Sequence, residues 1–272
     1  MVNDLGTDAS GAPGQQTPAA EVVAAIVAEG GRAIASFHDV ADWNAAGEMV
    51  RLALDAFGDL HVLVNNAGIL RDRTMANLSE EEWDSVVKVH LKGHAGPTHH
   101  AMKYWRDRSK ASHKVQASLI HTTSISGLVG NFGQGNYAAA KLGIVGLSMV
   151  SALEGEKYGV RSNAVAPSAR TRLATGGTPG GATTFRAPDN PEDFDPWDPG
   201  NVSPLIGWLA SEACPATAQI FHVLGRSIRV FGMPSVSQQF DHDGRWTLDA
   251  LDDKLVPALL KPAAFSEFVV PE

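Results

Sequence analysis

The chain has 272 residues, of which 44% are hydrophobic and 19% charged, with a formal net charge of −8 at pH 7. This length and composition suit one α/β domain with an extension, and the acidic balance argues against nucleic acid or an anionic membrane as the main partner. A single cysteine, Cys214, excludes an intramolecular disulfide and favours a reducing compartment, and neither a membrane-spanning run nor a signal peptide is expected, so the predicted location is cytoplasmic.

The first part of the chain alternates helical and strand patterns. Apolar residues recur at helical spacing over residues 18–29 and stop at Gly30 and Gly31, which predicts a helix with a glycine end. A short strand is predicted over residues 32–37 and a second helix over residues 42–57. Residues 61–68 then read as a buried strand that runs into an Asn/Gly turn.

The middle of the chain continues the alternation. Ser79 and Glu82 have the spacing of a capping box and predict a helix running toward Arg106, followed by a polar loop over residues 106–114. Strands are predicted over residues 118–122 and 160–167, on either side of a helix over residues 136–158.

The last third changes character. Residues 174–200 are dense in Gly, Pro, Asp and Thr, which is typical of a loop that covers a binding site. A helix is predicted over residues 201–212 and a final strand over residues 219–224. The tail over residues 226–272 carries too many aromatic residues for a solvated segment, so we expect it to pack on the domain or on a neighbouring subunit.

Three predicted strands end near Asn65, Ser124 and Pro167, and polar residues stand at these ends. Parallel strands alternating with helices build an open sheet with helices on both faces, and such sheets bind ligands at the carboxyl ends of their strands. The sequence therefore predicts a doubly wound α/β fold in three layers, with a site at that edge.

Tyr137 and Lys141 stand four residues apart in a predicted helix and therefore share one helix face. A phenol titrates near pH ~10, and a neighbouring ammonium favours the phenolate by roughly 1 to 3 pKa units. Tyr137 is thus a candidate base for an alcohol proton, with Lys141 as the cation and Ser124 as a donor to the substrate oxygen. The alternative role of Ser124 is a strand-end hydroxyl that bonds the local backbone.

The order and spacing of Asn65-Asn66-Ala67-Gly68, Ser124, Tyr137 and Lys141 resemble the short-chain dehydrogenase/reductase family. A closer likeness, to the dehydrogenase part of peroxisomal multifunctional β-oxidation enzymes and their bacterial relatives, rests on four runs: residues 2–6, 65–73, 89–93 and 130–137. The resemblance covers roughly residues 1–225, which we take as the domain, and implies a Rossmann-like fold with residues 226–272 as an extension.

The resemblance also implies a nicotinamide cofactor and the residues that hold it. Asp4 stands where an acid accepts hydrogen bonds from the adenosine ribose and repels a 2′-phosphate, which favours NAD over NADP. A loop aspartate that caps a turn is the alternative role of Asp4. The other implied cofactor contacts are Asp39, Val40, Asn65, Ala67, Gly68, Tyr137, Lys141, Pro167 and Thr171. Ser168 follows Pro167 where the family usually has glycine, so its side chain is expected to narrow the nicotinamide pocket.

His90 stands where many members of the family have an asparagine that holds a kinked helix and a relay water. We interpret His90 as a substitute at this relay position. His90 and His94 are also four residues apart, but no carboxylate or cysteine ligand accompanies them, so we predict no metal.

The largest departure from the family is at the N-terminus. Residues 1–6 match the end of the family's second strand, so the first strand and the glycine-rich turn that receives the pyrophosphate have no counterpart. Residues 11–14 contain glycines, but they follow no buried strand and include Pro13. We expect a start site placed too far downstream or a truncation, and residues 1–37 detached from the main sheet.

Three functions stay open. The leading one is an NAD-dependent dehydrogenase of secondary alcohols, with 3-hydroxyacyl-coenzyme A or a steroid as candidate substrates. A non-catalytic homologue that assembles with other subunits and an NADPH-dependent carbonyl reductase are the alternatives. A homodimer or homotetramer is expected through residues 79–106 and 136–158. Its buried contacts are expected from Val86, Val89, Ile144, Leu147 and Val150, some of which must face the protomer's own core. Candidate basic residues for an acyl-coenzyme A are Arg71, Arg73, Lys103, Arg106, Arg108 and Lys110.

Overall fold

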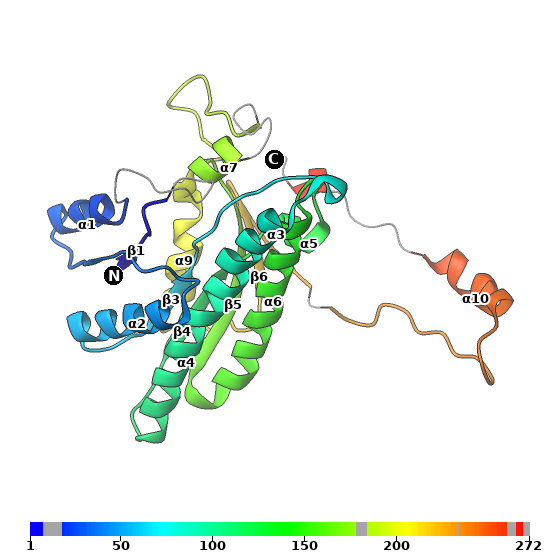
Figure 1. Ribbon diagram of the computed structural model, residues 1–272, viewed down its shortest axis with the longest axis horizontal. Helices are drawn as coiled ribbons and strands as arrows, with labels where there is room; N and C mark the ends of the chain where they lie inside the picture. Colours follow the sequence, from blue (N-terminus) through cyan, green and yellow to red (C-terminus); the bar gives the residue numbers. More distant parts are fainter. Residues whose placement is uncertain (8–17, 178–183, 233, 260–264, 269–272) are drawn as a thin grey trace.

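The computed structural model describes residues 1–7, 18–177, 184–232, 234–259 and 265–268. The glycines of residues 11–14 lie outside the described residues. A five-stranded sheet in the order β3-β4-β5-β6-β7 forms the centre of the molecule (Figure 1). Its parallel strands are β3 (Val62–Asn65), β4 (Ala117–Thr122), β5 (Val160–Ser168) and β6 (Ile220–Leu224).

Helices cover both faces of this sheet, as the alternating pattern predicts. Leu119 and Ile120 are neighbours on β4, so their side chains point to opposite faces. Leu119 packs with Trp105 of α4 (Gly93–Lys110), and Ile120 packs with Leu205 of α9 (Ser203–Ala210). The helices α2 (Trp43–Phe57), α4 and α6 (Gly135–Gly155) lie in one layer. The three-layer prediction is confirmed.

The predicted helix over residues 79–106 is divided. The Ser79–Glu82 capping box opens α3 (Glu80–Val87), a π-helical turn follows at Lys88–Lys92, and α4 then runs to Lys110. The predicted loop at residues 106–114 is therefore wrong over its first five residues. Lys103 pairs with Asp107 one turn later at 3.2 Å, a spacing that supports a helix even without an apolar period.

The N-terminal segment forms a separate unit. β1 (Val2–Asn3) and β2 (Ala35–Ser36) pair in parallel as a two-stranded sheet, with α1 (Pro18–Ala28) beside them. Figure 1 shows this unit at one side of the main sheet. Within the described residues it shares no strand pairing with the five-stranded sheet, which agrees with the predicted detachment. β3 is the end strand, and Val64 on it is 42% exposed.

The sheet continues past residue 225, the predicted end of the domain. β7 (Ser227–Phe231) pairs antiparallel with β6, from which it is separated by a tight turn. The short helix η6 (Phe265–Phe268) returns to the body, where the ring of Phe268 lies 5.3 Å from that of Phe231. Between them, α10 (Leu248–Leu255) projects from the body and has no buried residue (Figure 1). The extension thus contacts the domain at its two ends.

Within the described residues, one helix, Gly135–Tyr158, is long and apolar enough to cross a membrane by length and composition, a test that a buried core helix also passes. It nevertheless packs along β4 and β5, with Ile144 and Val145 buried, as a core helix does. Val86 and Ile144 are buried inside the protomer, so they cannot supply the predicted subunit interface. The exposed large apolar residues of α6 are Leu142, Val150 and Leu153.

The remaining elements are short. α5 (Ile125–Val129) follows β4, and α7 (Arg172–Gly177) follows β5 within the segment that the sequence predicts as a loop from residue 174. Single turns lie at Met75–Asn77, Glu156–Tyr158, Pro199–Asn201 and Val256–Ala258.

Candidate active site

A cavity of about 1480 Å³ opens at the carboxyl ends of the parallel strands. Every catalytic and cofactor residue predicted from the sequence lines it, although these residues come from seven separate stretches of the chain. These are Asp4, Asp39, Val40, Asn65, Ala67, Gly68, His90, Ser124, Tyr137, Lys141, Pro167 and Thr171. The cavity therefore joins the predicted proton-transfer residues to the predicted cofactor residues.

Lys141 is fixed between α6 and the end of β4. Its ammonium donates to the carbonyl oxygen of Thr122 at 2.7 Å, and the Thr123 hydroxyl donates to the Lys141 carbonyl oxygen at 2.7 Å. α5 also sits directly on α6, since a Cβ on Gly127 would meet Lys141 Cβ at 2.8 Å. The end of β4 and the first turns of α6 are therefore locked together.

Ser124 has two kinds of contact. It caps α5, where its hydroxyl oxygen accepts from the amide of Ser126 at 3.2 Å, as the local-backbone alternative supposes. Its side chain also lies near the Tyr137 phenol and lowers the pKa of that group. Because the amide of Ser126 uses one lone pair of the Ser124 oxygen, the hydroxyl hydrogen is directed elsewhere and can reach the phenol oxygen.

Burial dominates the titration of this pair. The pKa of Tyr137 is raised to about 12, chiefly because burial disfavours the phenolate, with the Asp72 carboxylate also raising it. Burial lowers the pKa of Lys141 to about 7. The expectation that Lys141 lowers the pKa of Tyr137 below its ordinary value is therefore wrong for the protein without ligands. The lysine nitrogen lies 5.5 Å from the centre of the phenol ring.

His90 lies in the π-helical turn and packs edge-on to Tyr137, with ring centroids 5.1 Å apart. Its Nε2 contacts the backbone of Ile69, at 2.8 Å from the carbonyl oxygen and 3.1 Å from the amide nitrogen. Burial lowers the pKa of His90 to about 3, so the ring is neutral. Gly68 must be glycine, because a Cβ there would approach the His90 ring to 2.3 Å.

The Asn65–Gly68 turn is tied to the neighbouring elements. Asn65 is buried, and its amide donates to the Thr98 hydroxyl at 3.1 Å. The Thr122 hydroxyl donates to Asn66 Oδ1 at 2.9 Å, which joins the ends of β3 and β4. Ala67 lines the cavity between them.

The opposite end of the cavity is held by local turns. Asp4 accepts from the amide of Gly6 at 2.7 Å, and Asp39 accepts from the amide of Ala41 at 2.8 Å. Both carboxylates therefore cap turns, as the alternative role of Asp4 supposes, while lining the cavity. Val40 packs against Gly93 at the start of α4, where a Cβ would come within 2.9 Å.

The segment after β5 covers one side of the cavity. Pro167, Thr171 and Phe185 line it, together with Arg172, which the sequence analysis did not select. The Ser168 hydroxyl is engaged with His222 Nε2 at 3.1 Å on the neighbouring strand. Arg170 forms an ion pair with Asp195 and donates its amide to the Trp197 carbonyl oxygen at 2.7 Å. The Gly/Pro-rich segment is thus anchored at its base.

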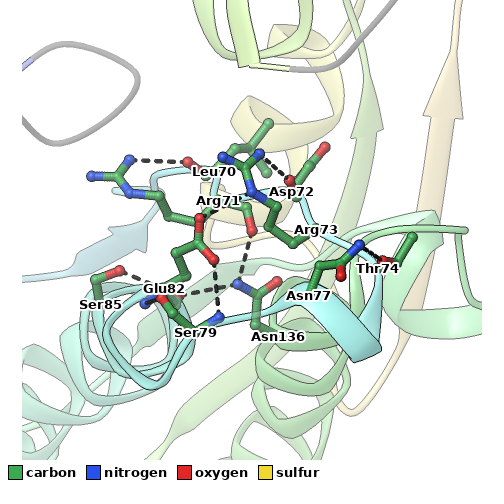
Figure 2. Close-up of polar contacts among 10 residues, drawn as sticks. All are labelled: Leu70, Arg71, Asp72, Arg73, Thr74, Asn77, Ser79, Glu82, Ser85 and Asn136. Carbon is green, nitrogen blue, oxygen red and sulfur yellow. Dashed lines mark hydrogen bonds and ion pairs between the residues drawn. The ribbon is translucent and has the colours of Figure 1, made fainter.

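Sequence reasoning missed three polar residues beside the proton-transfer group. Asp72, Gln134 and Asn136 join the loop after β3 to the start of α6, and Figure 2 shows Asn136 between that loop and α3. They stand in two of the four runs that carry the family resemblance, residues 65–73 and 130–137. Spacing gave no sign that they meet, because Asp72 and Gln134 are 62 positions apart.

A family model described as short chain dehydrogenase matches residues 6–175. The chain belongs to the short-chain dehydrogenase/reductase family. Hydroxyacyl-CoA dehydrogenase ChsB1 of Mycobacterium tuberculosis is 39% identical over 82% of this chain and 70% of the relative. Peroxisomal multifunctional enzyme type 2 of Mus musculus is 40% identical over 82% of this chain and 28% of the relative. A crystal structure of a short-chain dehydrogenase from Mycobacterium avium has a TM-score of 0.82 and 44% identity, covering 96% of this chain and 87% of that one.

These relatives confirm the resemblance to the multifunctional enzymes and the fold. The chain is therefore an oxidoreductase of a family that uses a nicotinamide cofactor. The residues present fit such a group in part, because the carboxylates of Asp4 and Asp39 line the same cavity as Tyr137 and Lys141. Among the described residues, no glycine-rich turn leads from a strand into a helix to receive the pyrophosphate.

Proposed function

We propose that the protein transfers a hydride between a secondary alcohol or its ketone and NAD, with Tyr137 exchanging the hydroxyl proton. The observation that carries this proposal is the meeting of Ser124, Tyr137 and Lys141 in one cavity with the predicted cofactor residues. Similarity to a hydroxyacyl-CoA dehydrogenase supports a 3-hydroxyacyl thioester as substrate.

The side chains have distinct parts in this reaction. Ser124 donates to the substrate oxygen and holds it beside the phenol. Tyr137 takes the hydroxyl proton in the oxidation and returns it in the reduction. Lys141 and Tyr137 would hold the nicotinamide ribose, and Asp4 and Asp39 the adenosine. A bound oxidised nicotinamide supplies the hydride acceptor, and its positive charge favours the phenolate.

The raised pKa of the Tyr137 phenol affects ketone reduction and alcohol oxidation differently. With a pKa of about 12, Tyr137 is protonated at neutral pH in the protein without ligands. It is then ready to give a proton to a ketone. Oxidation of the alcohol requires the phenolate and should therefore gain rate as the pH rises.

NAD is the proposed cofactor because a carboxylate at Asp4 would repel a 2′-phosphate. An NADPH-dependent carbonyl reductase is the alternative. The turn at Asp4 carries no Lys or Arg that could pair with the 2′-phosphate of NADPH. The Asp4 carboxylate instead accepts from the amide of Gly6 in its own turn.

An acyl-coenzyme A needs positive charge near the cavity. Lys103, Arg106, Arg108 and Lys110 lie toward the carboxyl end of α4, which in Figure 1 points away from the strand ends that hold the site. We therefore discard them as contacts for the substrate. Arg71 lies on the loop after β3, and Arg172 lines the cavity. Arg73, on the same loop, pairs with Glu82 at 3.3 Å. Arg71 and Arg172 are the proposed contacts.

The assay offers 3-hydroxyacyl-coenzyme A of several chain lengths and hydroxysteroids, each with NAD and with NADP, and follows the reduced nicotinamide. Turnover of the thioester with NAD supports the proposal. A profile confined to steroids overturns the substrate class, and a profile confined to NADP overturns the cofactor. Absence of turnover with every pair, in protein that melts cooperatively, favours a non-catalytic partner.

We also propose a homodimer or homotetramer that uses the exposed apolar residues of α6. Leu142, Val150 and Leu153 are 53%, 51% and 74% exposed, which is unusual for large apolar side chains on one helix. Leu153→Asp should reduce the mass measured by light scattering at micromolar protein. A monomeric mass for the unmodified protein contradicts the assembly.

A further inference from the structure

Two buried amide side chains stand at the start of the helix that carries Tyr137. Gln134 is 4% exposed and Asn136 is fully buried. Both face the loop that follows β3, residues Leu70 to Thr74. The backbone amide of Arg73 on this loop donates to the Gly133 carbonyl oxygen at 2.8 Å, and Arg73 pairs with Gln134 as an isolated β-bridge. The loop is thus fixed against the first turn of α6.

Gln134 links this loop to Ser124. Its Nε2 donates to Asp72 Oδ2 at 2.8 Å, and its Oε1 accepts from the Ser126 hydroxyl at 2.7 Å. The amide of Ser126 in turn donates to the Ser124 oxygen at 3.2 Å. The carboxylate of Asp72 only accepts, so it fixes which end of the Gln134 amide faces Ser126.

Asn136 links the same loop to Tyr137. Its Nδ2 donates to the carbonyl oxygens of Arg71 at 3.0 Å and Glu82 at 3.1 Å, as Figure 2 shows. Its Oδ1 accepts from the backbone amide of Tyr137 at 2.7 Å. Amides in the first turn of a helix have no partner within the helix. Asn136 therefore ties the backbone of Tyr137 to two other elements.

Asp72 adds a charge to this arrangement. Its Oδ1 is buried without a hydrogen-bond partner, while Oδ2 accepts from Gln134. Its negative charge disfavours the phenolate of Tyr137. The loop after β3 therefore acts on Ser124 and Tyr137 in two ways, through hydrogen-bonded contacts and through the charge of Asp72.

We propose that the loop from Leu70 to Thr74 is a positioning element for proton transfer, which orients Ser124 through Asp72 and Gln134 and orients Tyr137 through Asn136. This inference rests on the proposed dehydrogenase function. None of the three residues touches the reacting atoms in this scheme. They act by setting the distance and direction between the Ser124 and Tyr137 oxygens.

The test uses Gln134→Met, which keeps the length of the side chain and removes its hydrogen bonds, and Asp72→Asn, which keeps an acceptor for Gln134 and removes the charge. The matched control is Asn77→Ala on the same stretch, because Asn77 is exposed and its side chain donates to the nearby Thr74 hydroxyl at 3.1 Å. Asn136→Ala serves as a second positioning variant, with cooperative melting as the check that it folds.

We expect Gln134→Met and Asn136→Ala to lower kcat by about 10- to 100-fold, the usual cost of misplacing reacting groups, with KM for NAD within about threefold. Asp72→Asn should move the ascending limb of the pH profile of alcohol oxidation to lower pH, because the phenolate is then less disfavoured. Asn77→Ala should match the wild-type enzyme. Wild-type kcat in Gln134→Met and an unmoved pH profile in Asp72→Asn overturn the inference.

A second measurement separates this inference from the proposed function. Crystal structures of the wild-type chain and Gln134→Met, without ligands, show whether the placement of the Ser124 hydroxyl relative to the Tyr137 phenol depends on Gln134. A displaced Ser124 hydroxyl in the variant supports positioning even in a chain without turnover. An unchanged placement of the two oxygens overturns positioning, whereas an inactive wild-type enzyme overturns only the function.

Discussion

The two ends of the cavity are built differently. At the end that holds Tyr137, Lys141 is 2% exposed and bonded to the end of β4, and Asn136 is buried between three elements. At the end that holds Asp4, this residue follows a two-residue strand of a separate sheet, and its carboxylate caps its own turn. One end is set by the main core, and the other by the small two-stranded unit. We infer that Ser124, Tyr137 and Lys141 are held in place by the core, and that the affinity for the cofactor is easier to change than the arrangement of these three residues.

The most direct way to break the first end is Tyr137→Phe. It removes the exchangeable proton and keeps the ring that packs against His90 at 5.1 Å. We expect kcat to fall by about 1000-fold, within the range for loss of a general acid or base, with NAD affinity nearly unchanged. Turnover is followed by nicotinamide absorbance and affinity by calorimetry. Retention of wild-type turnover would show that Tyr137 is not the proton acceptor.

The second prediction concerns the end that holds Asp4. We expect weak NAD binding, because the described residues offer no glycine-rich turn and an unsolvated pyrophosphate is costly. Adding an N-terminal strand and glycine-rich turn should raise affinity at least about 100-fold, since two charged hydrogen bonds contribute about 3 kcal/mol or more. The control extension carries valines in place of the glycines. Tight binding to the unextended chain, measured by calorimetry, contradicts the prediction.

Acid should weaken the end that is built into the core. Burial lowers the pKa of His90 to about 3 and that of His121 to about 4. The unfolded chain binds these protons below pH ~6.5, so stability is complete above that pH and is lost as the pH falls toward 4. Each histidine contributes up to about 1.4 kcal/mol per pH unit.

This pH dependence is measured by urea unfolding between pH 7 and 4.5. His121→Asn should flatten the decline by up to that slope. His61→Asn is the control, because the side chain of His61 is 70% exposed. An identical slope in wild type and His121→Asn would exclude His121 as a source of the acid sensitivity.

The smallest expected effect is at the segment that covers the cavity. Asp195→Asn removes the ion pair with Arg170, whose side chain is 29% exposed. Because partly exposed pairs contribute about 1 kcal/mol or less, we expect KM for the substrate to rise about threefold with kcat unchanged. Asp189→Asn is the control, since its pair with Arg186 is exposed and local. A larger change in kcat than in KM would place Asp195 in the chemistry instead of the cover.

The sequence by itself determined the local parts of this molecule. The capping box at Ser79 and the glycine after α2 set helix ends through contacts within a few residues. Apolar strands and the four-residue spacing of Tyr137 and Lys141 determined the fold class and the centre of the site. These features follow from periodicity and side-chain chemistry, which can be recognised in the sequence without knowledge of tertiary contacts.

Only the tertiary structure decided how these parts meet and which effect dominates. Gln134 contacts Asp72 across 62 positions, and no local pattern encodes that contact. Burial, a property of the packed fold, raised the pKa of Tyr137 where the nearby Lys141 predicted a decrease. Lys103 and Arg108 lie toward the carboxyl end of α4. Because α4 begins at the site, this end lies far from the substrate. Distances through space, not along the chain, set these outcomes.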